Sequence, residues 1–532
     1  MIKTTAFYPE YLPREKWRPF LQKVKDGGIS GIRFGEFAWG LLQPDEGVFD
    51  WTVFDDAFAL CEEMGVKIIL CTPTACPPIW LAEKYPDVLP VNEAGGRIAF
   101  GGRQHRCYNS PSMRKYTEIV VDELAKRYGG RKSLMAWQID NELGAEHKYC
   151  HCPVCTAKFQ QFLEDKYKTI EELNNRWMTT FWAQNYARFG QIKTPAQVEA
   201  YLPVKPHPSL IYEFLRFSSK SVVDFAAFQY DIIKRRSTAP VTTNQDDFSM
   251  ADNTDWLGMF DKLDVAAFDI YTDKAYELGY YFDLARSVKG KPCWILEYGT
   301  GYDTAAMLDV AHEKGCELAG LFAFHPFRAG QEQGTRGLID AFGNEAPGYY
   351  KYRDWQPKET VPARKTIYMR HDFDSSWSYS AAEFHTWEDG WAFRQARVVY
   401  QRYLIHTVYK AVYGAGYAAD FPRRLPASDC EGRVMLLPMQ IIYKEDLADQ
   451  LLGFVRAGGV VIATNDLFRK NEDNAYLTEL PPFYKELDPS LRAFFPDDLG
   501  DKFLEFAVGK GKVVIVDRKL DENGWEKELT RA

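Results

Sequence analysis

Short, continuously apolar segments alternate with longer amphipathic segments over the first two-thirds of the chain. Continuous apolar segments are typical of parallel strands that are buried on both faces of a sheet. They predict eight strands, at residues 4–8, 31–37, 66–72, 134–139, 241–244, 265–271, 293–297 and 318–325. Helical spacing lies between them, as at residues 53–64 and 111–128. Eight strands that alternate with helices over about 350 residues predict an α/β fold, the (β/α)8 TIM barrel.

The rest of the chain predicts an insertion and a second domain. The fourth and fifth strands are separated by more residues than one helix needs, which predicts a rim insertion around residues 143–237 of a catalytic barrel that spans residues 1–360. Residues 361–532 predict a smaller doubly wound α/β domain with a short C-terminal tail. Its expected strands are residues 366–369, 433–438, 460–464 and 512–516, and its expected helices are residues 397–413 and 447–456.

The composition narrows the class of protein. The net charge of −9 argues against a nucleic-acid partner, and no apolar run is long enough to span a bilayer, so no membrane partner is expected. The first residues lack the apolar segment of a secretory signal, and ten cysteines are too few for a disulfide framework, so we expect a cytoplasmic location. Aromatic residues make up 15% of the chain, which suits a sugar site where ring faces stack on aromatic side chains.

Two glutamates stand at the ends of predicted barrel strands. Asn141 and Glu142 follow the fourth strand, and the seventh strand ends at Glu297. Because the carboxyl ends of barrel strands meet at one mouth, these two carboxylates are expected to face each other. Glycosidic bond cleavage needs such a pair, one to protonate the leaving oxygen and one to attack the anomeric carbon. Asn141 is placed to bind the sugar 2-hydroxyl, and Tyr271, at the end of the sixth strand, to donate to the nucleophile.

The same residues allow plainer interpretations. Acidic residues at strand ends are often only solvated or ion-paired. Glu36, at the end of the second strand, either binds substrate or pairs with Arg33. A sugar-binding protein without catalysis would keep the pocket but would not need both glutamates. An active amidotransferase in the second domain is disfavoured, because the strand at residues 433–438 is not followed by a cysteine nucleophile.

A cysteine cluster follows Glu142. Cys150, Cys152 and Cys155 lie close together in the sequence, and Cys107 lies in the loop after the third strand. Because adjacent βα loops are neighbours in space, the four thiolates are expected to form a closed, structural zinc site. The alternatives are four unrelated buried thiols or a redox pair of Cys152 and Cys155. A nearby histidine, His105 or His151, could also replace one sulfur as a ligand.

With these residues in hand, the chain resembles glycoside hydrolase family 42, a family of retaining β-galactosidases. The similar segments are residues 33–39, 72–86, 137–142, 181–182, 217–219, 242–244 and 328–333. The resemblance implies that Glu142 is the acid/base and Glu297 the nucleophile. It implies further that the sugar in the minus-one subsite is held by Arg33, Asn141, Trp182 and Glu332, and that the four cysteines bind zinc without any organic cofactor. The second domain resembles the family's glutamine-amidotransferase-like domain, which implies oligomerisation as a homotrimer.

Some residues depart from the family pattern. Tyr298 and Gly299 follow Glu297 where the family usually has other residues, and Gly334 and Thr335 stand where the family usually has Phe-His. His325, at the end of the eighth strand, is expected to replace the missing histidine. The resulting prediction is a retaining exo-glycosidase that acts on terminal β-D-galactosides. The alternatives are another glycone (a β-mannoside, a β-glucoside or an α-L-arabinopyranoside) and, less favoured, a non-catalytic sugar-binding trimer.

Overall fold

A computed structural model describes residues 1–147, 149–195, 206–246, 254–290, 293–360, 363–381 and 399–531. The chain forms two compact units. The first unit contains Met1–Cys155 and Ser218–Val361, and the second contains Thr156–Phe217 and Pro362–Ala532. Residues 156–217 lie inside the segment that the sequence assigns to a rim insertion, and they make most of their contacts within the second unit.

The first unit is built on a parallel sheet in the order β5-β4-β3-β2-β1-β9-β8-β7-β6. The short strands β5 and β6 stand at opposite ends of this order but are separated in the chain only by Thr243 and Asn244. They are therefore two pieces of one barrel strand, and the sheet closes into the predicted (β/α)8 barrel. The strands are β1 (Ile2–Ala6), β2 (Gly31–Phe34), β3 (Lys67–Cys71), β4 (Leu134–Gln138), β5 (Val241–Thr242), β6 (Gln245–Asp246), β7 (Ala267–Asp269), β8 (Trp294–Glu297) and β9 (Leu318–Leu321).

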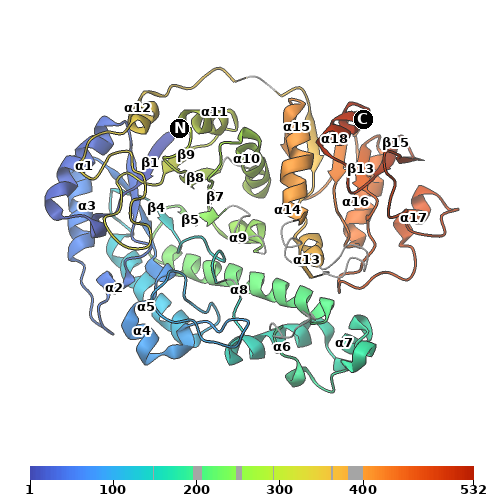
Figure 1. The fold of residues 1–532 in the computed structure, drawn as a ribbon, viewed down its shortest axis with the longest axis horizontal. Coiled ribbons are helices and arrows are strands. Elements are labelled where there is room, and N and C mark those ends of the chain that lie inside the picture. The colour runs from blue at the N-terminus through green and yellow to red at the C-terminus, as the bar shows by residue number, and fades with distance from the viewer. Residues whose placement is uncertain are drawn as a thin grey trace. The chain divides into compact units, whose positions relative to one another are not determined.

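Helices follow the strands and surround them (Figure 1). Helix α9 packs against α10, α10 against α11, and α11 against α12. The local sequence sets the helix ends: the Ser110 hydroxyl accepts from the Met113 N–H at the start of α5, and Gly65, at φ +71°, ends α3. The helices are α1 (Arg14–Asp26), α3 (Thr52–Met64), α5 (Pro111–Tyr128), α8 (Pro208–Lys234), α9 (Trp256–Lys262), α10 (Ala275–Lys289), α11 (Thr304–Glu313) and α12 (Pro347–Asp354).

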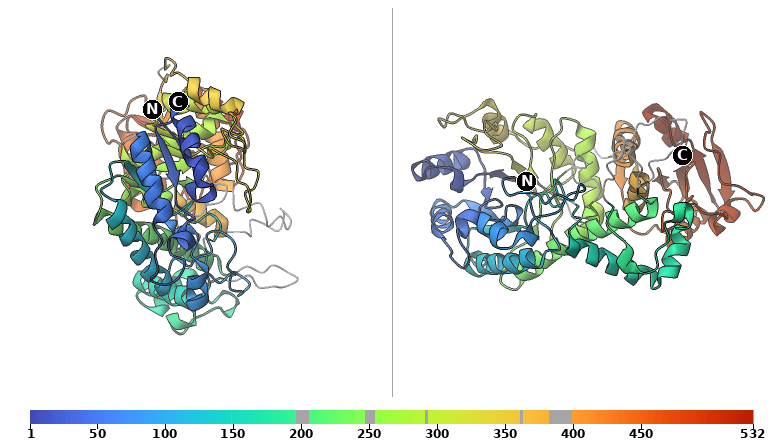
Figure 2. Two further views of the ribbon diagram at one scale, coloured as in Figure 1. Left: turned by 90° about the vertical axis from the view of Figure 1, so that its left-hand side faces the viewer. Right: turned by 60° about the horizontal axis from the view of Figure 1, so that its bottom comes forward.

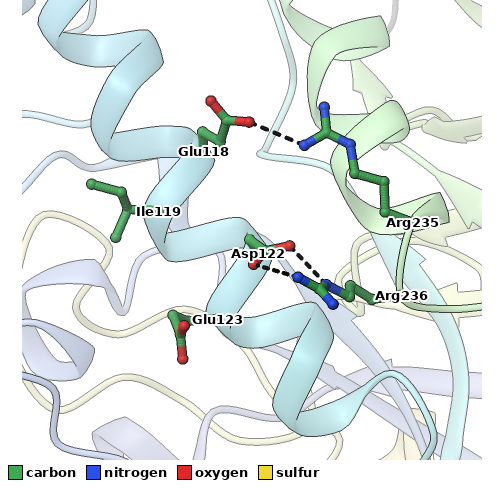
Figure 3. Close-up of a pocket in the computed structure, with 6 residues that line it drawn as sticks. All are labelled: Glu118, Ile119, Asp122, Glu123, Arg235 and Arg236. Carbon is green, nitrogen blue, oxygen red and sulfur yellow. Dashed lines mark hydrogen bonds and ion pairs between the residues drawn. The ribbon is translucent and has the colours of Figure 1, made fainter.

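Apolar side chains fill the barrel, and ion pairs brace its outer helices. Ile69, Ala136 and Leu296, from three different strands, belong to one buried cluster. On the outside, Glu118 and Asp122 of α5 pair with Arg235 and Arg236, which follow α8, with an N–O distance of 3.0 Å in each case (Figure 3). These pairs join α5 to the end of α8, two elements that are far apart in the sequence.

The second unit contains a six-stranded sheet in the order β11-β10-β12-β13-β15-β14, parallel except for β14. Numbered along the chain, the five parallel strands run 2-1-3-4-5, which confirms the predicted doubly wound α/β domain. Figure 2 shows this sheet in orange and red. Helix α16 (Glu445–Arg456) packs against β13 and β15, and α15 (Lys410–Gly414) against α18 (Glu522–Arg531). The strands are β10 (Thr366–Met369), β11 (Ala418–Asp420), β12 (Val434–Leu437), β13 (Val460–Thr464), β14 (Leu504–Val508) and β15 (Gly511–Val516).

The helix expected at residues 397–413 is divided. Helix α14 (Val399–Tyr403), a π-helical turn (Leu404–Tyr409) and α15 follow one another, while residues 397–398 lie outside the described residues. The remaining helices of this unit include α6 (Pro153–Tyr167), which begins in the first unit, and α7 (Ile170–Trp177), α13 (Phe373–Ala381) and α17 (Pro482–Leu487). None of the described helices combines the length and the apolar composition needed to cross a membrane.

Candidate active site

Three carboxyl groups meet at the carboxyl end of the barrel strands. Glu297 is the last residue of β8, Asp269 the last residue of β7, and Glu142 lies four residues after β4. One oxygen from each group lies within 4.8 Å of the other two. Glu142 is 4% exposed and Glu297 5% exposed. Two sequence-predicted glutamates, 155 residues apart, therefore meet in one nearly buried site.

Donors from three other strands surround Glu297. The Arg33 guanidinium lies 2.5 Å from its Oε1, the Asn244 amide donates to the same oxygen at 3.4 Å, and the Tyr271 hydroxyl donates to Oε2. Arg33 comes from β2, Asn244 from between β5 and β6, and Tyr271 from the loop after β7. These donors fix the orientation of the carboxylate and compensate its negative charge.

Arg33 is itself held by a buried network. Its Nη1 donates to Gln138 Oε1 at 2.9 Å, and its Nη2 lies 3.2 Å from Glu36 Oε1 and 3.2 Å from the Tyr8 hydroxyl oxygen. Tyr8 donates to Glu36 at 2.6 Å. Of the two interpretations of Glu36, the structure shows the pair with Arg33. Arg33 is thus bound on several sides, so its position beside Glu297 is fixed.

Glu142 has different surroundings. Its Oε2 accepts from Asn141 Nδ2 at 3.0 Å and lies 3.2 Å from Arg103 Nη2. Burial, followed by the negative charge of Glu297, raises the pKa of Glu142 to about 8, and the charge of Arg103 opposes this rise. The raised pKa favours the protonated form of Glu142 near neutral pH, which is the form that a general acid needs.

The backbone around Glu142 is in an unusual conformation. Asp140 has φ +56° and Glu142 φ +42°, both in the left-handed region that residues with side chains rarely adopt. Buried bonds hold this turn: Arg106 lies 2.5 Å from Asp140, Thr74 donates to Asp140, and the Glu142 N–H donates to the Asn244 carbonyl at 3.1 Å. Such local strain persists only where the surroundings determine the conformation, and it occurs often at active sites.

A cavity of about 890 Å³ adjoins these groups. Its lining includes three aromatic residues, Tyr8, Tyr11 and Phe327, and two charged residues, Arg103 and Glu332. Glu332, predicted to bind the sugar, lies 3.6 Å from Arg103, which also pairs with Glu142 and Glu146. Aromatic faces beside charged groups are what a sugar ring with polar edges requires.

Two other residues predicted to contact the sugar, His325 and Trp182, are not among the described residues that line this cavity. His325 is 2% exposed and packs edge-on against Phe7 and Phe327, and burial lowers its pKa to about 4, so it is neutral. Trp182 belongs to the second unit, where it is 67% exposed on a short 3₁₀ helix (Phe181–Ala183). Contact of either residue with a sugar stays a prediction.

The four cysteines come together on the first unit. Their Sγ atoms all lie within 4.8 Å of one another, with Cys107 at 3.9 Å from Cys152 and 3.4 Å from Cys155. Four thiolates at about 2.3 Å from a tetrahedral zinc would be roughly 3.8 Å apart. Three N–H groups point at the sulfurs: those of Val91, Asn109 and Cys155. Donors of this kind stabilise metal-bound thiolates, so the donor set fits zinc.

Three site residues were not assigned a role from the sequence. Asn244 lies within a segment that resembles the family, but it stands among other polar residues (Thr242, Thr243 and Gln245), so nothing local singles it out. Asp269 is the only acid inside the sixth predicted strand, a signal that could have marked it, because an unpaired charge is costly in a buried strand. Arg103 lies in a polar loop without periodicity, and no sequence signal distinguishes it.

Comparison with known proteins places the chain in a family. The sequence profile of glycoside hydrolase family 42, described as beta-galactosidase, matches residues 6–355. Beta-galactosidase BgaA of Clostridium cellulovorans is 29% identical over 90% of this chain and 74% of its own length. Beta-galactosidase BgaA of a Thermus species is 28% identical over 95% of this chain and 81% of its own length.

The fold also matches a solved structure. The beta-galactosidase of the Antarctic haloarchaeon Halorubrum lacusprofundi superposes with a TM-score of 0.87, at 24% identity, over 100% of this chain and 89% of that one. The profile match covers about two-thirds of the chain and includes both glutamates. The chain is a glycoside hydrolase and belongs to glycoside hydrolase family 42.

Proposed function

We propose that the protein is a retaining, exo-acting β-galactosidase in which Glu297 is the nucleophile and Glu142 the acid/base. The observation that carries this proposal is the distance of at most 4.8 Å between an oxygen of each carboxyl group. Retaining glycosidases place the two groups about 5–5.5 Å apart, whereas inverting enzymes leave roughly 6.5–9.5 Å for a water molecule.

The two steps follow from the surroundings of each glutamate. Glu297, oriented by Arg33 and Tyr271, attacks the anomeric carbon while protonated Glu142 donates its proton to the departing glycosidic oxygen. Glu142 is then a carboxylate and removes a proton from water, which attacks the anomeric carbon and releases Glu297. Asn141, which is bonded to Glu142 and Asn244, is placed to bind the sugar 2-hydroxyl.

Galactose as the glycone rests on the names of the relatives. Residues 298–299 and 334–335 differ from the family pattern, so the glycone needs a direct test. A panel of p-nitrophenyl glycosides should give a kcat/KM for the β-D-galactoside at least about tenfold above those for the β-mannoside, β-glucoside and α-L-arabinopyranoside. A higher value for one of these would replace galactose, and no turnover of any glycoside would exclude the hydrolase.

Two further properties are part of the proposal. Cys107, Cys150, Cys152 and Cys155 would hold one zinc ion as a closed structural site, which would brace two rim loops of the barrel and leave no position for substrate. The second unit would mediate assembly into a homotrimer, a role taken from the family resemblance alone. Neither property enters the chemical steps.

A further inference from the structure

Asp269 is a buried acid that the two catalytic steps do not use. Its side chain is fully buried, at 0% exposure, at the end of β7. An oxygen of Asp269 lies within 4.8 Å of oxygens of both Glu142 and Glu297. The site thus has one carboxyl group more than double displacement requires.

The hydrogen-bond partners of the Asp269 side chain suit a neutral carboxylic acid better than a carboxylate. Its Oδ2 accepts from Asn244 Nδ2 at 2.6 Å, and its Oδ1 has no hydrogen-bond partner among the described residues. Arg33, whose charge acts on Asp269, gives its ion pairs to Glu36 and Glu297 instead. A buried carboxylate with neither a cation nor a donor on one oxygen would be strongly destabilised.

Asp140 shows how the same site treats an acid that has a counterion. It is equally buried, but Arg106 lies 2.5 Å from its Oδ1, and Thr74 and the Asn141 N–H also donate to it. Among the described residues, Asp269 has one hydrogen-bond donor, the Asn244 amide. Burial raises the pKa of both aspartates, but only Asp140 has a paired cation to oppose the rise.

Asn244 connects Asp269 to both glutamates. The Nδ2 that bonds to Asp269 also lies 2.8 Å from Asn141 Oδ1 and 3.4 Å from Glu297 Oε1, and the Asn244 Oδ1 accepts from the Glu142 N–H at 3.2 Å. The position of this amide depends on an acceptor at Asp269 Oδ2. An acceptor without a negative charge would hold Asn244 without adding a third charge to the site.

We propose that Asp269 remains a neutral carboxylic acid, with its proton on Oδ1, and that it acts as a positioning residue that holds Asn244 between the acid/base and the nucleophile. This inference deepens the proposed function and rests on it. The titratable and charged groups that interact with Asp269 are Glu297 from β8, Glu142 from the loop after β4, Arg33 from β2 and Tyr271 from the loop after β7. Burial, then the charges of Glu297 and Glu142, raise the pKa of Asp269 well above its usual range, and Arg33 only partly opposes them.

A spectroscopic test decides the protonation state without using activity. In protein labelled with [4-¹³C]aspartate, the infrared spectrum at pH 7 should contain the C=O stretch of a labelled carboxylic acid. The difference between wild type and Asp269→Asn should show the loss of this band, whereas Asp140→Asn should retain it. Loss of only a carboxylate band in Asp269→Asn would overturn the proposal, whatever the wild type hydrolyses.

A kinetic test addresses the positioning role. Asp269→Ala should lower kcat about 100-fold, because a displacement of about 1 Å at the reacting groups has that effect. Asp269→Asn, which keeps the acceptor, should recover most of this loss and leave the alkaline limb of kcat/KM at the wild-type pH. If the limb moves down by about one unit, Asp269 is ionised in the wild type and raises the pKa of Glu142, and the proposal is wrong.

Discussion

At the scale of single residues, Glu297 and Glu142 have the same side chain but different neighbours. Glu297 receives donors from Arg33, Asn244 and Tyr271. Glu142 is equally buried, but its paired cation is Arg103, at 3.2 Å, and its pKa rises to about 8. These different surroundings suit the roles proposed above, Glu297 as nucleophile and Glu142 as proton donor, as in other sites where two carboxyl groups divide these roles.

The charge of Arg103 should set the upper pH limit of activity. Arg103→Gln removes the cation that stabilises ionised Glu142, so the pKa of Glu142 should rise further and the alkaline limb of kcat/KM should move to higher pH. We expect a shift of about one unit, with a higher KM because Arg103 also lines the cavity. Arg131→Gln, which removes an exposed pair with Glu62, is the control. A limb that moves to lower pH would contradict this account.

At the scale of elements, the alternation of apolar segments predicts every barrel strand but not where each one ends. The strands expected at residues 31–37, 265–271 and 318–325 end at Phe34, Asp269 and Leu321. The residues beyond them are buried or half-buried, but their backbone turns into the loops at the barrel mouth. An apolar sequence pattern indicates which residues are buried, but not where the hydrogen bonds between strands stop. The predicted strands therefore extend too far at their carboxyl ends, where the site lies.

The two glutamates of the site were predicted from the sequence, whereas Asp269 and the contacts that join these groups were not. Glu142 and Glu297 could be placed because barrel topology brings strand ends together. Arg103 and Asn244 act through contacts between loops of different strands, which no local pattern encodes. The fifth barrel strand, expected at residues 241–244, consists of β5 and β6, with Asn244 in the interruption between them.

The proposed zinc site, which would join two loops at the barrel mouth, can be tested by substitution. Cys152→Ser should lower the zinc content from about one ion per chain to none and lower the melting temperature, because a structural zinc site contributes directly to folding. Cys316→Ser, which alters a buried cysteine outside the cluster, should retain the metal. Metal analysis together with calorimetry measures both. Wild-type protein without zinc after expression in zinc-containing medium would refute the site.

At the scale of the whole molecule, the chain combines a barrel that holds all the proposed chemistry with a second unit that has its own core. Leu437, Leu451 and Val513 belong to one buried cluster of that unit, with 0% exposure each. Its strand order is that of a doubly wound domain. The described part of the second unit contributes none of the three carboxyl groups, so its proposed task is assembly.

The oligomeric state of the protein can be measured directly. Sedimentation equilibrium should give about three times the chain mass of 61.2 kDa, since the family resemblance implies a homotrimer. The value should hold across a tenfold range of protein concentration if the interface is as large as permanent assemblies require. A mass of one chain at all concentrations would remove the assembly role from the second unit.

The nucleophilic role of Glu297 is the central claim, and chemical rescue tests it most directly. Glu297→Ala should lose nearly all turnover of an activated β-galactoside, and azide should restore it by occupying the space of the missing carboxylate. The product should be the α-galactosyl azide, with inverted configuration, because one displacement replaces two. Glu297→Ala with wild-type activity, or azide rescue of Glu142→Ala alone with the α-configuration, would contradict the account.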